Sequence, residues 1–114
     1  MRFVRKVIDN IVILDITGEI RLGESAKQLS TELAKTLSDP QVEGVIIQME
    51  NINYIDSTGL GELVGYLGRF QDKGKRLKLV KPNQTVMKLL QLTKLDQVFK
   101  IYANEEFAIE DFVG

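Results

Sequence analysis

The sequence contains no cysteine, no histidine and no tryptophan. Without these side chains the chain cannot form disulfides, thiol redox centres, Ser-His-Asp or Cys-His catalytic pairs, or zinc sites with histidine ligands. No apolar run approaches the roughly 20 residues that a membrane-spanning helix needs. No signal-peptide pattern develops before Asp9 and Asn10. We therefore expect a cytoplasmic protein with no metal site, no cofactor and no direct membrane insertion.

An excess of charge of either sign is also missing, because 15 basic residues face 16 acidic ones. This balance argues against tight nonspecific binding to nucleic acid, which requires many phosphates to be neutralised. The one dense basic cluster consists of Lys73, Lys75, Arg76, Lys78 and Lys81. We interpret it as the solvated edge of a strand, since lysines often protect sheet edges, with a partner-binding patch as the alternative.

The length of 114 residues fits one domain over residues 1–114, with no linker rich in proline or serine and no internal repeat. A chain of this size buries only about two thirds of its unfolded surface, so every helix must contribute one apolar face to the core. Little is left to enclose a substrate cavity. We therefore expect function on a surface loop or a helix end.

The spacing of apolar residues predicts alternating strands and helices, with a tight turn at Asp9 and Asn10 and an Asx-rich turn before Ser57. Strands are expected at residues 3–8, 11–17, 44–49, 76–80 and 98–101. Helices are expected from residue 24 to near 39–40, and at residues 57–72, 86–93 and 107–112. The order β-β-α-β-α-β-α-β-α indicates an α/β fold, in which helices accompany a single-layer, mixed and mostly parallel sheet.

The predicted helix at 57–72 combines an apolar stripe with a glycine stripe. Residues Leu60, Leu63, Val64, Leu67 and Phe70 recur at helical spacing and are expected to face the core. Gly61, Gly65 and Gly68 form a neighbouring stripe, although each glycine in a helix interior costs about 1 kcal/mol relative to alanine. Two interpretations follow: the helix packs closely against its own domain, or it offers a smooth face to another protein.

The three polar residues Asp56, Ser57 and Thr58 precede this glycine-bearing helix. Short oxygen-bearing side chains cap helix N-termini, so plain capping explains part of the pattern. One side chain satisfies the cap, however, and a helix N-terminus also favours an added phosphate. Ser57 is therefore a candidate phosphorylation switch. The spacing of the glycines matches neither a dinucleotide fingerprint nor a phosphate-binding loop.

The segment Asp56-Ser57-Thr58-Gly59-Leu60-Gly61, with the apolar run before it at 45–52, resembles the signature of bacterial anti-sigma factor antagonists, the STAS domains. The resemblance extends in element order over essentially the whole chain, including 16–20 and 75–80. It implies that Ser57, with Thr58 as the second choice, is phosphorylated by a partner that is both an anti-sigma factor and a serine kinase. The unphosphorylated antagonist binds that partner and frees the sigma factor, and a serine phosphatase resets the switch.

The exposed hydroxyl cap beside a stripe of small residues predicts a partner surface on the first half of the helix and on the adjacent turn around 18–23. Its expected members are Arg21, Asp56, Ser57, Thr58, Gly59, Gly61 and Gly65. Arg21 departs from the family, whose members with this activity often carry an acidic residue there, and changes the local charge by about two units at the kinase-facing edge.

Two alternatives to a non-enzymatic, phosphorylation-switched antagonist are open at this point. STAS domains also serve as constitutive scaffold subunits of stress-signalling or lipid-transport complexes, in which the serine need not be phosphorylated. A small catalytic or nucleotide-binding domain could instead use Asp56 and Ser57, but an enzyme would need an acid-base partner and a closed pocket.

Overall fold

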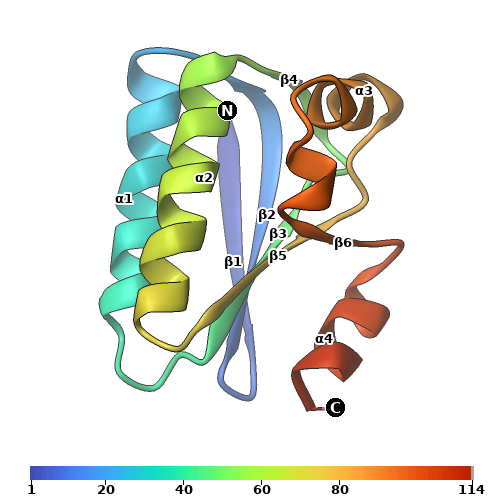
Figure 1. Ribbon diagram of the computed structural model, residues 1–114. Helices are drawn as coiled ribbons and strands as arrows, with labels where there is room; N and C mark the ends of the chain where they lie inside the picture. Colours follow the sequence, from blue (N-terminus) through green and yellow to red (C-terminus); the bar gives the residue numbers. More distant parts are fainter. Residues whose placement is uncertain (114) are drawn as a thin grey trace.

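The computed structural model describes residues 1–113 and contains six strands and four α-helices among them (Figure 1). The strands are β1 (Arg2–Ile8), β2 (Ile11–Ile20), β3 (Gly44–Gln48), β4 (Ile52–Ile55), β5 (Arg76–Val80) and β6 (Lys100–Tyr102). The helices are α1 (Glu24–Ser38), α2 (Ser57–Asp72), α3 (Gln84–Leu92) and α4 (Glu105–Val113), with a 3₁₀ helix, η1, at Leu95–Gln97.

The strands form one mixed sheet in the order β1-β2-β3-β5-β6. Only β1 runs antiparallel to its neighbour, and the pairs β2–β3, β3–β5 and β5–β6 are parallel. The short strand β4 pairs in parallel with the last residues of β2, beyond the part of β2 that pairs with β3. The predicted α/β fold with a mostly parallel mixed sheet is confirmed.

The N-terminal hairpin has the predicted position and turn. Its two strands pair from Arg2 opposite Thr17 to Ile8 opposite Ile11. The turn between them holds Asp9 at φ 54°, a left-handed conformation that aspartate tolerates better than most residues.

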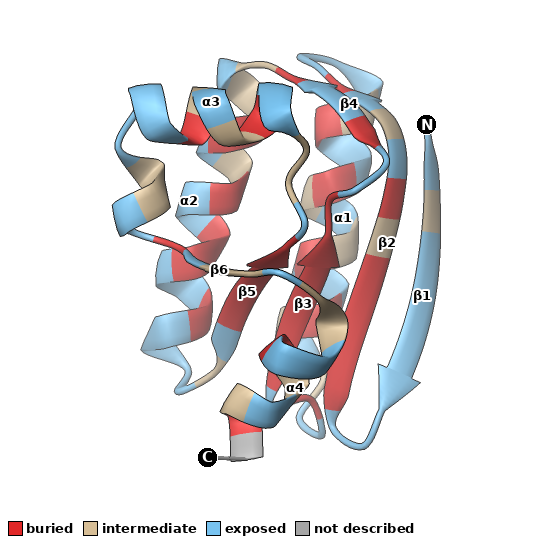
Figure 2. Ribbon diagram, turned by 90° about the vertical axis from the view of Figure 1, so that its right-hand side faces the viewer, coloured by how far each residue is buried: buried red, intermediate tan, exposed pale blue. Residues whose placement is uncertain are grey.

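Helices cover both faces of the sheet, and the core is correspondingly divided. The helices α1 and α2 lie side by side on one face, and α4 lies on the other (Figures 1 and 2). The larger core on the α1–α2 face includes Leu14 and Ile47 from the central strands and Phe70 from α2. The smaller core under α4 includes Ile13, Ile46 and Phe112. Alternate residues of β2 and β3 therefore face opposite cores, as expected for central strands.

Two predicted segments differ from the structure. The residues before Ser57 were expected to form only a turn, but Ile52–Ile55 form β4. Its buried residues are the first and last of the four, so the alternation that indicates a strand is absent. The last strand is β6 rather than 98–101, because the N–H groups of Val98 and Phe99 donate to the carbonyl of Leu95, the first residue of η1.

The interpretation of the basic cluster as a strand edge is wrong. Strand β5 lies between β3 and β6, and the side chain of Lys78 is 1% exposed beneath α4. Lys75 Nζ donates to the carbonyls of Leu37 and Asp39, where α1 ends. Arg76 donates in the same way to carbonyls at the end of α4. Lys75 and Arg76 therefore stabilise the C-termini of α1 and α4, where the helix dipole favours positive charge.

Candidate functional site

The carboxylate of Asp56 organises the start of α2. Its Oδ1 accepts a hydrogen bond from the backbone N–H of Gly59 at 3.0 Å, which makes Asp56 the N-cap. Its Oδ2 accepts from the N–H of Leu22 at 2.8 Å, so the same side chain ties the β2–α1 loop to α2. The hydrogen bonds from Gly59 and then Leu22 lower the pKa of Asp56 below its usual value. Asp56 is therefore a carboxylate at neutral pH.

The side chain of Ser57 is exposed at the first position of α2, and Thr58 beside it is partly buried. Because Asp56 supplies the cap, neither hydroxyl is needed to satisfy the helix N-terminus. The structure thus separates the capping residue from the exposed hydroxyl, as the three consecutive polar residues had indicated.

Arg21 lies next to this helix start because of the pairing of β2 with β4. Ile20 and Ile55 are partners at the ends of the two parallel strands, so the residues that follow each strand lie at the same end of the sheet. The guanidinium of Arg21 forms an ion pair with Glu19 at 2.8 Å and lies 4.3 Å from the centre of the Tyr54 ring. The hydrogen bond with Glu19, more than any other contact, raises the pKa of Arg21.

The glycines of α2 divide into two groups. Gly59 is buried, and a Cβ atom there would lie 2.7 Å from Ile55 Cγ1 and 2.8 Å from Ile20 Cγ2. Gly61, Gly65 and Gly68 are exposed, and a Cβ atom on any of them would meet no atom within 4 Å. Close packing inside the domain is therefore the wrong interpretation for the stripe of Gly61, Gly65 and Gly68, and it applies only to Gly59, which the stripe did not include.

The apolar stripe of α2 also differs from its prediction at one position. Val64 is 40% exposed and lies among the exposed glycines instead of in the core. Tyr66 is buried in its place, with its hydroxyl 3.2 Å from Ser30 Oγ on α1. The stripe of α2 that faces solvent therefore consists of glycines with one apolar side chain of moderate size, that of Val64.

A family comparison decides the class of protein to which this geometry belongs. The family model described as STAS domain matches residues 2–108. The chain belongs to the STAS domain family. The crystal structure of a protein from Thermotoga maritima named putative anti-sigma factor antagonist superposes with a TM-score of 0.88 at 30% identity, covering 96% of this chain and 92% of that one.

Two named antagonists are also similar to this STAS chain. The anti-sigma-B factor antagonist of Bacillus subtilis is 29% identical over 102 residues, which cover 90% of this chain and 91% of that protein. The unphosphorylated form of the anti-sigma factor antagonist SpoIIAA has a TM-score of 0.85 at 24% identity, covering 99% and 97% of the two chains. The latter likeness concerns the fold alone.

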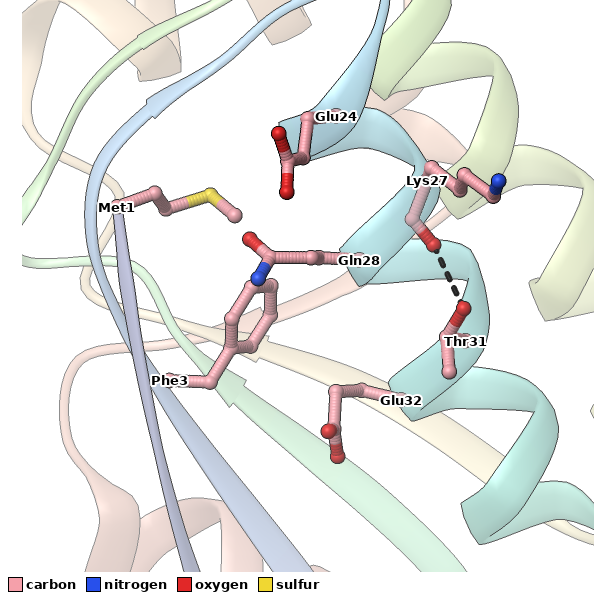
Figure 3. Close-up of a pocket in the computed structure, with 7 residues that line it drawn as sticks. All are labelled: Met1, Phe3, Glu24, Lys27, Gln28, Thr31 and Glu32. Atoms are coloured by element: carbon pink, nitrogen blue, oxygen red, sulfur yellow. Dashed lines mark hydrogen bonds between the residues drawn. The ribbon is translucent and has the colours of Figure 1, made fainter.

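One groove of this STAS chain lies away from the α2 start. It measures about 760 Å³ between β1 and α1 and is lined by Met1, Phe3, Glu24, Lys27, Gln28, Thr31 and Glu32. The amine of Lys27 points out of the groove, and the Thr31 hydroxyl donates a hydrogen bond to the Lys27 carbonyl at 2.9 Å (Figure 3). None of the predicted site residues contributes to this groove.

Over residues 1–113, no group of three or more acidic side chains converges in a way that could hold a metal ion. Within the same residues, none of the helices has the length and apolar character needed to cross a bilayer. Leu22, which is 78% exposed, lies in the turn at 18–23 that was expected to join the partner surface. Tyr54, which is 39% exposed, had no earlier signal in the sequence, and only the pairing of β4 with β2 places it at the site.

Proposed function

We propose that this chain is an anti-sigma factor antagonist, a non-enzymatic module that binds an anti-sigma factor and so frees a sigma factor. The observation that carries the proposal is the exposed Ser57 hydroxyl, which Asp56 leaves free by capping α2 itself. Membership of the STAS family and the similarity to a named anti-sigma-B factor antagonist support it. Sigma factors act on RNA polymerase, so the proposed location is the cytoplasm.

The proposed switch is phosphorylation of Ser57 by an anti-sigma factor that is also a serine kinase, with a serine phosphatase reversing it. Exposure of Ser57 favours it over the partly buried Thr58 as the phosphate acceptor. A phosphate would add about −1.5 to −2 charge beside the carboxylate of Asp56. In a bound partner's interface, such a charge would replace favourable contacts with repulsion.

The proposed contact surface combines the start of α2 with the β2–α1 loop. Ser57 and Thr58 offer hydroxyls, and Gly61 and Gly65 let a partner approach the helix backbone closely. Arg21 offers a cation next to Asp56. Gly59 contributes indirectly, because its missing Cβ lets α2 pack against Ile20 and Ile55.

A second candidate is a constitutive STAS scaffold subunit of a larger assembly, such as a stress-signalling or lipid-transport complex. The observation that favours it is Arg21, whose guanidinium stacks on Tyr54 and pairs with Glu19. This arrangement presents a cation where related antagonists often carry an acidic residue, which alters the charge that a kinase would meet.

The test is incubation with ATP and a serine-kinase-type anti-sigma factor from the source bacterium, followed by mass spectrometry and a binding titration. We expect one phosphate on Ser57 and weaker binding of the modified chain. The variant Ser57→Ala should accept no phosphate and bind permanently, and Ser57→Asp should bind weakly. Thr58→Ala is the matched control and should behave as the unaltered chain. Absence of phosphate from both residues, or equal affinity of both forms, would favour the scaffold.

A further inference from the structure

A small apolar groove lies between β4 and α3. Figure 1 shows both elements at the end of the molecule where α2 begins. Its volume is about 290 Å³, and its walls include Tyr54 from β4 and Val86, Leu89 and Leu92 from α3. Strand β4 pairs only with β2, so the groove follows the side of β4 that has no strand partner.

Two side chains of this groove are more exposed than internal packing explains. Leu92 is 75% exposed and Tyr54 is 39% exposed. Single exposed apolar residues are ordinary on protein surfaces. Here, however, the two flank one concave site whose floor is already apolar, and such a combination is typical of a binding groove.

The groove is continuous with the surface around Ser57. The Tyr54 ring forms one wall of the groove, and the guanidinium of Arg21 stacks on the same ring, 4.3 Å from its centre. Asp56, two residues further along the chain, is tied to Leu22 of the same loop. A protein that covers Ser57 and Arg21 therefore reaches the groove by extending across Tyr54.

The charge at the groove defines what the occupant should carry. Lys88 lines the groove, and α3 contains no acidic residue. Within the described chain no carboxylate lies within 4.0 Å of the Lys88 amine. An occupant with a carboxylate next to its apolar side chain would neutralise this cation.

We propose that the groove between β4 and α3 is a second docking point for the anti-sigma factor, which inserts an apolar side chain flanked by a carboxylate. This inference rests on the proposed function and adds to it an anchor outside the phosphorylation site. Apolar side chains buried in a pocket at an interface commonly supply much of the binding free energy. The anchor would hold the partner while the start of α2 is presented to its kinase site.

The test compares Leu92→Ser with the matched control Phe107→Ser in calorimetric titrations against the serine-kinase-type anti-sigma factor. Phe107 is 54% exposed and lies on α4, which Figure 2 shows at the other end of the molecule from α3. We expect Leu92→Ser to weaken binding at least about tenfold and Phe107→Ser to change it less than about twofold. Both side chains are exposed, so both variants should melt as the unaltered chain does.

A charge-reversal pair tests the carboxylate. Lys88→Glu should weaken binding most at low salt, and Lys73→Glu, at the far end of α2, should leave it unchanged. If the unaltered chain binds and Leu92→Ser binds equally well, the groove is not a docking point and the proposed function stands. If the unaltered chain does not bind at all, the proposed function and this inference are both overturned.

Discussion

At the scale of single residues, the site depends on a division of roles between neighbours. One carboxylate oxygen of Asp56 accepts a hydrogen bond from the N–H of Gly59, and the other accepts from the N–H of Leu22. The exposed Ser57 is thereby left without a structural task, and a modification there need not disturb the cap. A regulatory hydroxyl next to a dedicated capping residue can change its chemistry while the helix keeps its start.

The two kinds of glycine in α2 should respond oppositely to alanine. Gly59→Ala should lower the free energy of unfolding by about 1–3 kcal/mol, because its Cβ would overlap Ile55 and Ile20. Gly65→Ala should raise it by about 0.5–1 kcal/mol, because the new methyl group meets only open space and alanine favours the helix. Urea denaturation of both variants measures the difference. An equal loss at both positions would contradict the assignment of the exposed stripe to a partner surface.

The sequence could predict those residue roles that depend on local chain order. A polar triplet before an amphipathic segment identifies a helix start, so Asp56, Ser57 and Thr58 were found. The exposure of Val64 could not be predicted, because helical spacing alone does not say whether the neighbouring Tyr66 or Val64 reaches the core. Tyr54 becomes a site residue only through the tertiary pairing of β2 with β4.

At the scale of elements, a buried cation fastens α4 to the sheet. Lys78 Nζ on β5 donates to the carbonyl of Ala108 at 3.0 Å and lies 3.3 Å from the carboxylate of Asp111. The ring of Phe112 lies 3.9 Å from the same amine, and the Tyr102 hydroxyl also donates to Asp111. Burial lowers the pKa of Lys78. The hydrogen bonds and the ring compensate for the loss of water around the charge.

The ionisation of Tyr102 should make the free energy of unfolding decline at alkaline pH. Burial first, and the hydrogen bond to Asp111 second, raise the pKa of Tyr102 to about 12, against 10.0 for the free side chain. The folded state keeps a proton that the unfolded chain loses, so this stabilisation is complete below pH 10 and is lost as pH rises toward 12. Lys78, with its lowered pKa, acts in the opposite direction and mostly below about pH 10.4. Tyr102→Phe should therefore flatten the decline in urea denaturation measured between pH 10 and 12.

The control for that experiment is Tyr54→Phe, because Tyr54 is 39% exposed and lies on β4, at the other end of the molecule from α4. It should retain the alkaline decline of the unaltered chain. An identical decline in Tyr102→Phe would mean that the contact with Asp111 does not persist in solution.

Most elements could be predicted from the sequence, and the failures share a cause. The helices at 24–38 and 57–72 were predicted at their observed positions, because apolar spacing and capping residues are local signals. Strand β4 was missed because its existence depends on β2, with which it pairs beyond a register shift. The burial of Lys78 was missed because it depends on where α4 lies, and a lysine in a basic run indicates exposure.

At the scale of the whole molecule, parallel pairing brings the features of the proposed function together at one end. Strands β2 and β4 run in the same direction and end together at Ile20 and Ile55. Three segments therefore lie at the carboxyl ends of these strands: the loop with Arg21, the start of α2 and the groove beside α3 (Figure 1). Ligand-binding loops often lie at this end of the sheet in α/β proteins. The opposite end, with the Asp9 turn, contains none of the site residues.

Phosphorylation of Ser57 should act on association and leave the fold almost unchanged. The new charge lies beside the Asp56 carboxylate, which opposes it, whereas the N-terminus of α2 favours an anion by roughly 0.3–1 kcal/mol. Arg21, near Asp56, adds a further favourable charge. These effects are small and opposed, so we expect the free energy of unfolding to change by less than about 1 kcal/mol. Urea denaturation of the phosphorylated and unmodified chains, with Ser57→Ala as the control, measures this change. A loss of several kcal/mol would instead mean that the phosphate breaks the contacts of Asp56 with Gly59 and Leu22, and that the switch works by unfolding the site.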